Sequence, residues 1–127
     1  MGLILDTNAL SAIAEGEREA AHEFAEAQSV AIPVIVLGEY LYGIAQSRRK
    51  TEYERWLADV LSVSSLLDVN RDTAIHYAAI RGQLRKTGSP IPSNDLWIAA
   101  LCLQHALPVL SRDRHFDSIH GLQRIAW

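Results

Sequence analysis

The sequence of 127 residues has a single cysteine, Cys102, and no long apolar run. One cysteine excludes an internal disulfide and any zinc site built from several cysteines. The longest uninterrupted apolar stretch, Leu96 to Leu103, is far shorter than the roughly 20 residues that span a bilayer. The N-terminal apolar run is broken at once by Asp6, unlike the apolar core of a signal peptide. We therefore expect no membrane segment and a cytoplasmic location.

A large excess of charge of one sign is also missing. Twelve Lys and Arg against fifteen Asp and Glu give a net charge of −3, which argues against nonspecific nucleic-acid binding by bulk charge. Apolar residues make up 49% and charged residues 21%, as in folded globular proteins. No repeat or Gly/Ser linker is present, and the length suits one domain. We predict a single domain over residues 1–127.

Short β-prone runs alternate with helical patterns along the chain. We predict strands at residues 3–5, 30–32, 65–69, 108–111 and 122–126. We predict helices at residues 8–15, 18–28, 34–45, 49–62, 71–87 and 94–103. Strands that alternate with helices indicate an α/β fold with a parallel sheet covered on both faces.

Several helix ends carry recognisable signals. Thr7 or Asn8 is predicted to cap the first helix, and Ser93 or Asn94 the last one. Asn70 is predicted to cap the helix that Gly88 ends. The last helix is apolar on every side, so we expect it to be central.

Four acidic residues follow predicted strands or lie in predicted helices close to them. Asp6 and Asp113 follow the first and fourth strands, Asp95 lies in the first turn of the central helix, and Glu39 lies in an apolar helix. Capping, a helix-dipole contact or a turn would explain Asp6, Asp95 and Asp113 separately. A carboxylate among apolar neighbours such as Glu39 is costly unless it is paired or metal-bound. Ligands bind at the carboxyl ends of parallel strands, so one shared site is the better explanation.

Such a cluster has a definite chemistry. Carboxylates without Cys or His favour Mg²⁺ or Mn²⁺, and these ions support phosphodiester hydrolysis. Mutual repulsion is expected to raise the pKa of at least one of the acids. His115 lies near the predicted site, where it is either an RNA contact or an ordinary surface residue. Arg81, Arg85 and Lys86 are either a track for phosphates or a solvated helix face.

Four short motifs follow one another along the chain: Leu5-Asp6-Thr7-Asn8, Gly38-Glu39 with Tyr42-Gly43, Asn94-Asp95 with Ile98-Ala99-Ala100, and Ser111-Arg112-Asp113. Together they resemble a PIN-domain ribonuclease of the VapC type, the toxin of a toxin–antitoxin pair. The resemblance covers essentially the whole chain. It implies a three-layer α/β/α sandwich with a short, mostly parallel sheet in strand order 3-2-1-4-5.

The resemblance also implies a function. It implies a Mg²⁺-dependent endoribonuclease acting on RNA, a homodimer and a cognate antitoxin of the VapB type. The implied catalytic acids are Asp6, Glu39, Asp95 and Asp113, with the ion held by Asp6, Asp95 and Asp113. The implied supporting residues are Thr7, Asn8, Ser111 and Asp117. We further expect an Arg or Lys of the antitoxin to reach Asp6 or Asp95.

Other functions remain as alternatives. A non-catalytic RNA- or antitoxin-binding module would keep the acids for metal or partner contacts. A receiver-type phosphoacceptor would need a lysine after the last strand, but the only lysines are Lys50 and Lys86. A haloacid-dehalogenase phosphatase would need a second Asp where this chain has Asn8.

Overall fold

The structure of the chain is a computed structural model that describes residues 2–127. Its five-stranded sheet is parallel and has the order β3-β2-β1-β4-β5. The strands are β1 (Gly2–Leu5), β2 (Ser29–Pro33), β3 (Ser65–Leu67), β4 (Val109–Leu110) and β5 (Arg124–Ile125). The predicted fold class and strand order are therefore confirmed.

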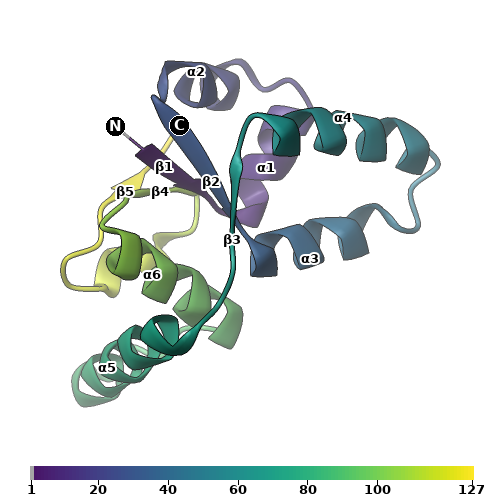
Figure 1. The fold of residues 1–127 in the computed structure, drawn as a ribbon. Helices are drawn as coiled ribbons and strands as arrows, with labels where there is room; N and C mark the ends of the chain where they lie inside the picture. The colour runs from purple at the N-terminus through teal and green to yellow at the C-terminus, as the bar shows by residue number, and fades with distance from the viewer. Residues whose placement is uncertain (1) are drawn as a thin grey trace.

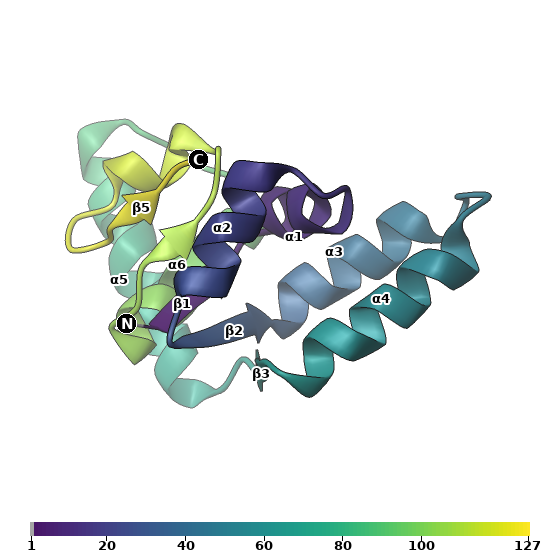
Figure 2. The same cartoon turned by 90° about the horizontal axis from the view of Figure 1, so that it is seen from above.

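Helices surround this sheet. They are α1 (Thr7–Ala14), α2 (Arg18–Glu26), α3 (Val34–Ile44), α4 (Lys50–Ser62), α5 (Arg71–Thr87) and α6 (Ser93–His105), with a 3-10 helix η1 (Arg114–Ser118). Helices α1 and α2 lie on one face of the sheet, and α5 and α6 on the other (Figure 1). Helices α3 and α4 extend beyond the sheet (Figure 2). No helix within residues 2–127 has the length and apolar character needed to cross a bilayer.

Helix α6 is central, as its all-round apolar pattern predicts. Residues 98–102 of α6 are all buried, and so are Leu3, Ile4 and Leu5 of the central strand β1. Cys102 is part of this core, and burial raises the pKa of its thiol. Helix α6 also packs along α5. The middle of α6 is therefore anchored in the core, and the helix is supported along its length by α5.

The predicted caps have mixed outcomes. Asn70 caps α5, where its side chain accepts from Thr73 N and completes a capping box, and Gly88 ends this helix in the left-handed conformation at φ 69°. The prediction for α1 is wrong, because Asp6 is the N-cap. The prediction for α6 is also wrong, because Pro92 occupies the cap position without a side-chain bond.

The reason for both errors lies in contacts distant in the sequence. Thr7 donates to Glu39, and Asn8 donates to Ser111, so neither side chain turns back onto α1. Asn94 donates to Glu39 in the same way. Strand β3 also ends earlier than predicted, at Leu67 rather than residue 69. The strand with which it pairs, β2, ends opposite it at Pro33.

Candidate metal-dependent nuclease site

Asp6 occupies the centre of the candidate site. It follows β1 directly, and only 4% of its surface is exposed. Its Oδ1 accepts from Thr7 N at 2.8 Å, and its Oδ2 accepts from Ser111 Oγ at 2.6 Å. Asp6 is thus both the cap of α1 and a buried carboxylate at the sheet edge.

Asn8 and Ser111 join the ends of β1 and β4. Asn8 Nδ2 donates to Ser111 Oγ at 3.2 Å, and Asn8 Oδ1 accepts from Arg112 N at 3.2 Å. Ser111 is fully buried, and its Oγ also accepts from Asp113 N at 2.9 Å. These bonds fix the turn after β4, and that turn carries Asp113.

Glu39 belongs to a second branch of the network. Its Oε1 accepts from Thr7 Oγ1 at 2.7 Å, and its Oε2 accepts from Asn94 Nδ2 at 3.2 Å. Helix α3 is thereby connected to the beginning of α1 and to the beginning of α6. The half-buried Glu39 carboxylate is held between two polar side chains.

Asp95 and Asp113 share a histidine. His115 Nδ1 lies 3.1 Å from Asp95 Oδ2 and 3.0 Å from Asp113 Oδ1. The three residues offer ligand atoms that all lie within 4.8 Å of one another. The structure therefore adds His115 to the acids predicted from the sequence. The η1 helix brings His115 back towards Asp95 on α6. The only signal for this contact in the local sequence is that His115 follows Asp113 by two residues.

The surroundings of the acids shift their pKa values for different reasons. Burial raises the pKa of Asp6 from 3.8 to about 6, against the hydrogen bonds from Ser111 and Thr7, which lower it. Repulsion from Asp95 and Glu39 raises the pKa of Asp6 further. Burial also raises the pKa of Asp95, while His115 opposes that shift. The expected raised pKa is confirmed, but its first cause is burial rather than repulsion.

Asp117 lies apart from this cluster. It forms a two-bond ion pair with Arg124, at 2.8 and 2.9 Å. This pairing lowers the pKa of Asp117. Its side chain is engaged in joining η1 to β5.

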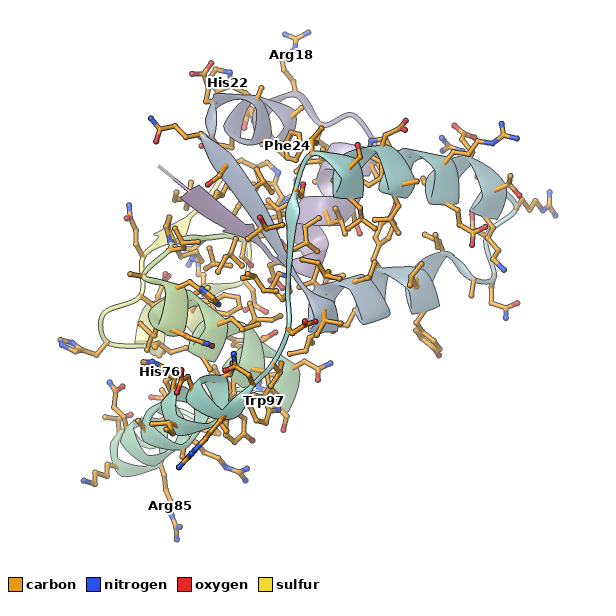
Figure 3. All side chains as sticks on the ribbon, in the orientation of Figure 1. Arg18, His22, Phe24, His76, Arg85 and Trp97 are labelled. Atoms are coloured by element: carbon orange, nitrogen blue, oxygen red, sulfur yellow. The ribbon has the colours of Figure 1, made fainter. Side chains whose placement is uncertain are left out.

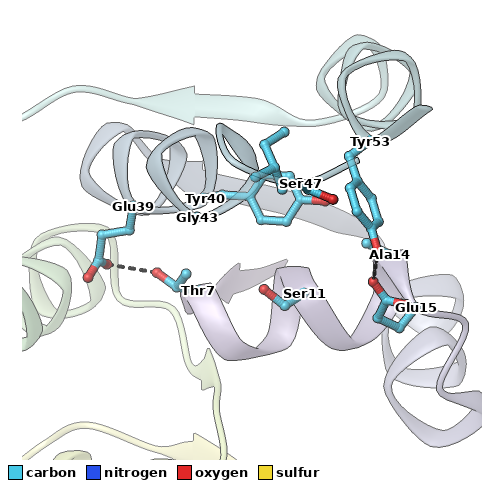
Figure 4. A pocket seen from close by; sticks show the side chains of 10 residues that line it. Thr7, Ser11, Ala14, Glu15, Glu39, Tyr40, Gly43, Ser47 and Tyr53 are labelled. Carbon is cyan, nitrogen blue, oxygen red and sulfur yellow. Dashed lines mark hydrogen bonds between the residues drawn. The ribbon is translucent and has the colours of Figure 1, made fainter. Parts of the chain in front are cut away.

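A cleft of about 340 Å³ opens beside the acids, between α1, α3 and α4. Thr7 and Glu39 line one end of it, and Glu15 and Tyr53 line the other (Figure 4). The Tyr53 hydroxyl donates to Glu15. The buried Tyr40 hydroxyl, also in the lining, has no hydrogen-bond partner within residues 2–127. The cleft thus has a carboxylate at each end, and the buried Tyr40 hydroxyl lies in its wall.

Known proteins share this architecture. A PIN-domain family profile matches residues 3–122. Ribonuclease VapC5 of Mycobacterium tuberculosis is 32% identical over 120 residues, which cover 93% of this chain and 87% of that protein. The crystal structure of VapBC2 from Rickettsia felis, bound to a promoter DNA fragment, matches with a TM-score of 0.89 and 25% identity, covering 100% of this chain and 99% of the other. The structure of VapBC-5 from Mycobacterium tuberculosis, of the VapBC family of toxin–antitoxin systems, matches with a TM-score of 0.79 and 27% identity, covering 99% and 98%.

The parallel sheet, the acids at its edge and the family profile all indicate the same class of protein. The chain belongs to the PIN-domain family. Within that family it is a member of the VapC ribonucleases. The receiver and dehalogenase alternatives are thereby set aside.

Proposed function

We propose that this chain is a Mg²⁺-dependent endoribonuclease, with Mn²⁺ as a substitute ion, and the toxin of a toxin–antitoxin pair. The observation that carries the proposal is the network of contacts that links the four acids. Ser111 contacts Asp6 and Asp113, Thr7 contacts Asp6 and Glu39, and His115 contacts Asp95 and Asp113. Three of the acids come from the ends of β1 and β4 and from the first turn of α6. Its relatives are named ribonucleases, which supports RNA as the substrate.

The donor set fits a divalent cation. Asp95 and Asp113 offer carboxylate oxygens close together, and Asp6 offers a third carboxylate that Ser111 joins to the turn carrying Asp113. Oxygen donors favour Mg²⁺ and Mn²⁺. When bound, such an ion activates water and stabilises negative charge on the phosphate and the leaving oxygen. We assign Asp6, Asp95 and Asp113 to holding it.

The remaining residues orient these groups. Ser111 and Asn8 hold Asp6 and the turn that carries Asp113. Thr7 and Asn94 hold Glu39 at the edge of the cluster. Glu39 Oε2 accepts only the longer of these two bonds, so it is the carboxylate oxygen that we assign to receiving a proton from attacking water.

The cleft beside the acids suits the proposed antitoxin. We propose that the C-terminal segment of a VapB-type antitoxin lies along this cleft and places an Arg or Lys at the acids. The carboxylates of Glu39 and Glu15 at its two ends can each receive a hydrogen bond from a peptide (Figure 4). Structural relatives described as VapBC complexes support this partner.

Self-association is part of the same proposal. Helix α3 exposes Leu41 and Tyr42, at 41% and 85% of their surfaces, on the part of the chain that extends beyond the sheet. A homodimer would cover such apolar groups. Sedimentation equilibrium of the chain alone tests this, with a monomer at all concentrations as the contrary result.

RNA cleavage is the decisive test of the nuclease proposal. Purified wild type should cleave structured RNA under single-turnover conditions in Mg²⁺ or Mn²⁺, and EDTA should abolish cleavage. Asp95→Asn should abolish cleavage as well. Asp68→Asn is the matched control, because Asp68 also follows a strand, the edge strand β3, but lies outside the cluster.

Two results would contradict the nuclease proposal. Full cleavage in EDTA, or equal cleavage by Asp95→Asn and Asp68→Asn, would exclude a metal-dependent site at these acids. Metal and RNA binding with no cleavage by wild type would instead favour the non-catalytic module.

A further inference from the structure

A second pocket, separate from the cleft beside the acids, adjoins the first turn of α6. It has a volume of about 500 Å³ and lies between α5, the segment before α6, and α6 itself. Its lining consists of Arg81, Leu84, Arg85, Gly88, Pro90, Ile91, Ser93 and Leu96. Two arginines line it and no acidic residue does, so the pocket is positively charged.

The two arginines differ from several others in this chain. Arg49, Arg112 and Arg124 each form an ion pair with a carboxylate. Within residues 2–127, Arg81 and Arg85 have no carboxylate partner. Arg85 points away from α5 into solvent (Figure 3). In a protein with a net charge of −3, two arginines without a carboxylate partner in the lining of one pocket are a local reversal of charge.

Aromatic rings adjoin the basic end of the pocket. Arg81 donates to the Tyr77 hydroxyl at 2.9 Å, and the Tyr77 ring stacks on Trp97 with centroids 4.0 Å apart. Trp97 lies between α5 and α6 (Figure 3). The Tyr77 bond holds the Arg81 guanidinium in place without neutralising it. Leu84 and Leu96 give the pocket an apolar lining that suits sugar and base carbons.

Helix α6 connects this pocket to the acids. Ser93 lines the pocket, Asn94 donates to Glu39, and Asp95 contacts His115. Three consecutive residues therefore face the pocket and the acidic site in turn. A helix is about 10 Å across, which a stacked nucleic-acid strand spans with about three nucleotides at about 3.4 Å each. A strand bound at the acids can thus reach the pocket.

We propose that the Arg81/Arg85 pocket binds backbone phosphates of the RNA strand, about three nucleotides from the cleaved bond. This inference rests on the proposed endoribonuclease function. Guanidinium groups bind phosphate oxygens with paired hydrogen bonds, and a basic groove beside aromatic rings is typical of single-strand binding. The pocket supplies affinity and register, while the acids act on the scissile phosphate.

The salt dependence of RNA binding tests this proposal. The probe is a fluorescently labelled single-stranded RNA of random sequence, followed by anisotropy in EDTA so that it is not cleaved. Each phosphate contact contributes about 0.7 to the slope of log K against log salt, which is about fivefold in affinity at about 0.1 M salt. Arg81→Ala/Arg85→Ala should therefore lower the slope by about 1.4 and weaken binding about 25-fold.

The matched control is Arg18→Ala/Arg55→Ala. Arg18 and Arg55 are exposed arginines on α2 and α4, without a carboxylate partner in the described part of the chain. Arg18 lies on the opposite side of the molecule from Arg85 (Figure 3). The control removes the same charge, so its slope should stay near that of wild type. Arg85→Glu is a second test variant, because it leaves the contact between Arg81 and Tyr77 intact; it should weaken RNA binding more than Arg85→Ala.

Two outcomes would overturn the pocket assignment. One is an equal slope and Kd for the pocket variant and the control variant, with both folded by circular dichroism. The other is unchanged RNA binding together with loss of an acidic peptide that wild type binds, which would assign the pocket to a protein partner.

Cleavage kinetics separate this inference from the function on which it rests. In Mg²⁺, the pocket variant should show a raised KM and a kcat close to that of wild type, since it keeps the acids. Wild type that cleaves no RNA would contradict the proposed function, while the binding comparison would still decide the pocket. If wild type and the pocket variant cleave RNA with the same KM, the assignment of the pocket to RNA binding is wrong, while the proposed nuclease function stands.

Discussion

Ser111 Oγ donates a 2.6 Å hydrogen bond to Asp6 Oδ2 and thereby joins the ends of strands β4 and β1. Both residues are buried, so the bond is protected from water. It stabilises the ionised carboxylate, while burial favours the protonated one, and burial dominates. The protein without metal therefore holds Asp6 in a state that costs free energy near neutral pH.

The first prediction concerns pH and Asp6. In EDTA, the Asp6 contribution to the free energy of unfolding should be fully present below pH 3.8 and lost as the pH rises through about 6, because the folded pKa lies above the unfolded one. The difference corresponds to at most about 3 kcal/mol. Asp6→Asn should flatten this pH dependence and raise Tm at neutral pH by roughly 3–6 °C, allowing for a weaker bond to Ser111.

Thermal melts of Asp6→Asn and Asp68→Asn across this pH range check that prediction. Asp68 is exposed, so its variant should follow the wild-type curve. A lower Tm for Asp6→Asn at neutral pH would mean that capping of α1 is the dominant role of Asp6.

The second prediction concerns metal binding. Mg²⁺ at a hundred times its Kd should stabilise wild type by about 2.7 kcal/mol, because the ion binds the folded state only. Asp95→Asn should gain much less, since it removes a charged oxygen from the cluster. Melts with EDTA and with a Mg²⁺ series measure the gain. An equal gain for wild type and Asp95→Asn would place the ion elsewhere.

The third prediction concerns His115. The hydrogen bond with Asp95 raises its pKa above 6.5. Stability from this contact is therefore present below pH 6.5 and lost as the pH rises through the raised value. In an NMR titration without metal, Asp95→Asn should lower the His115 pKa. Asp117→Asn is the control, because Asp117 is close in sequence but pairs with Arg124; an equal shift in both variants would contradict the contact.

The fourth prediction concerns the support of α6. Asn70 Oδ1 accepts from Thr73 N at 3.2 Å and from Gln104 Nε2 at 3.1 Å, so one oxygen caps α5 and joins it to α6. Asn70→Ala should lower stability by about 1 kcal/mol or more. Asn70→Asp keeps the acceptor and should retain most of that stability. Urea unfolding of both variants measures the difference, and equal losses would show that the acceptor oxygen is not what stabilises α5.

Local pattern was sufficient for much of the fold. The apolar β1 run, the all-apolar α6 and the signals at Asn70 and Gly88 each depend on residues within one element. Periodicity and capping are properties of neighbours in the chain, so they can be read from the sequence. The meeting of Asp6 and Asp113 was also predictable, because parallel strands end at one edge.

Only the tertiary structure decided how these acids are held. Asn8 and Ser111 are 103 positions apart, and Ser111 and Asp6 are 105 apart, so no local pattern encodes their bonds. The same contacts moved the caps of α1 and α6 away from their predicted residues. His115 contacts Asp95 through the η1 turn, and Arg124 pairs with Asp117, while Arg81 and Arg85 have no carboxylate partner among residues 2–127. The sequence shows which residue types are present. Their burial and pairing depend on which distant parts of the chain pack together, and burial is the main cause of the raised pKa of Asp6.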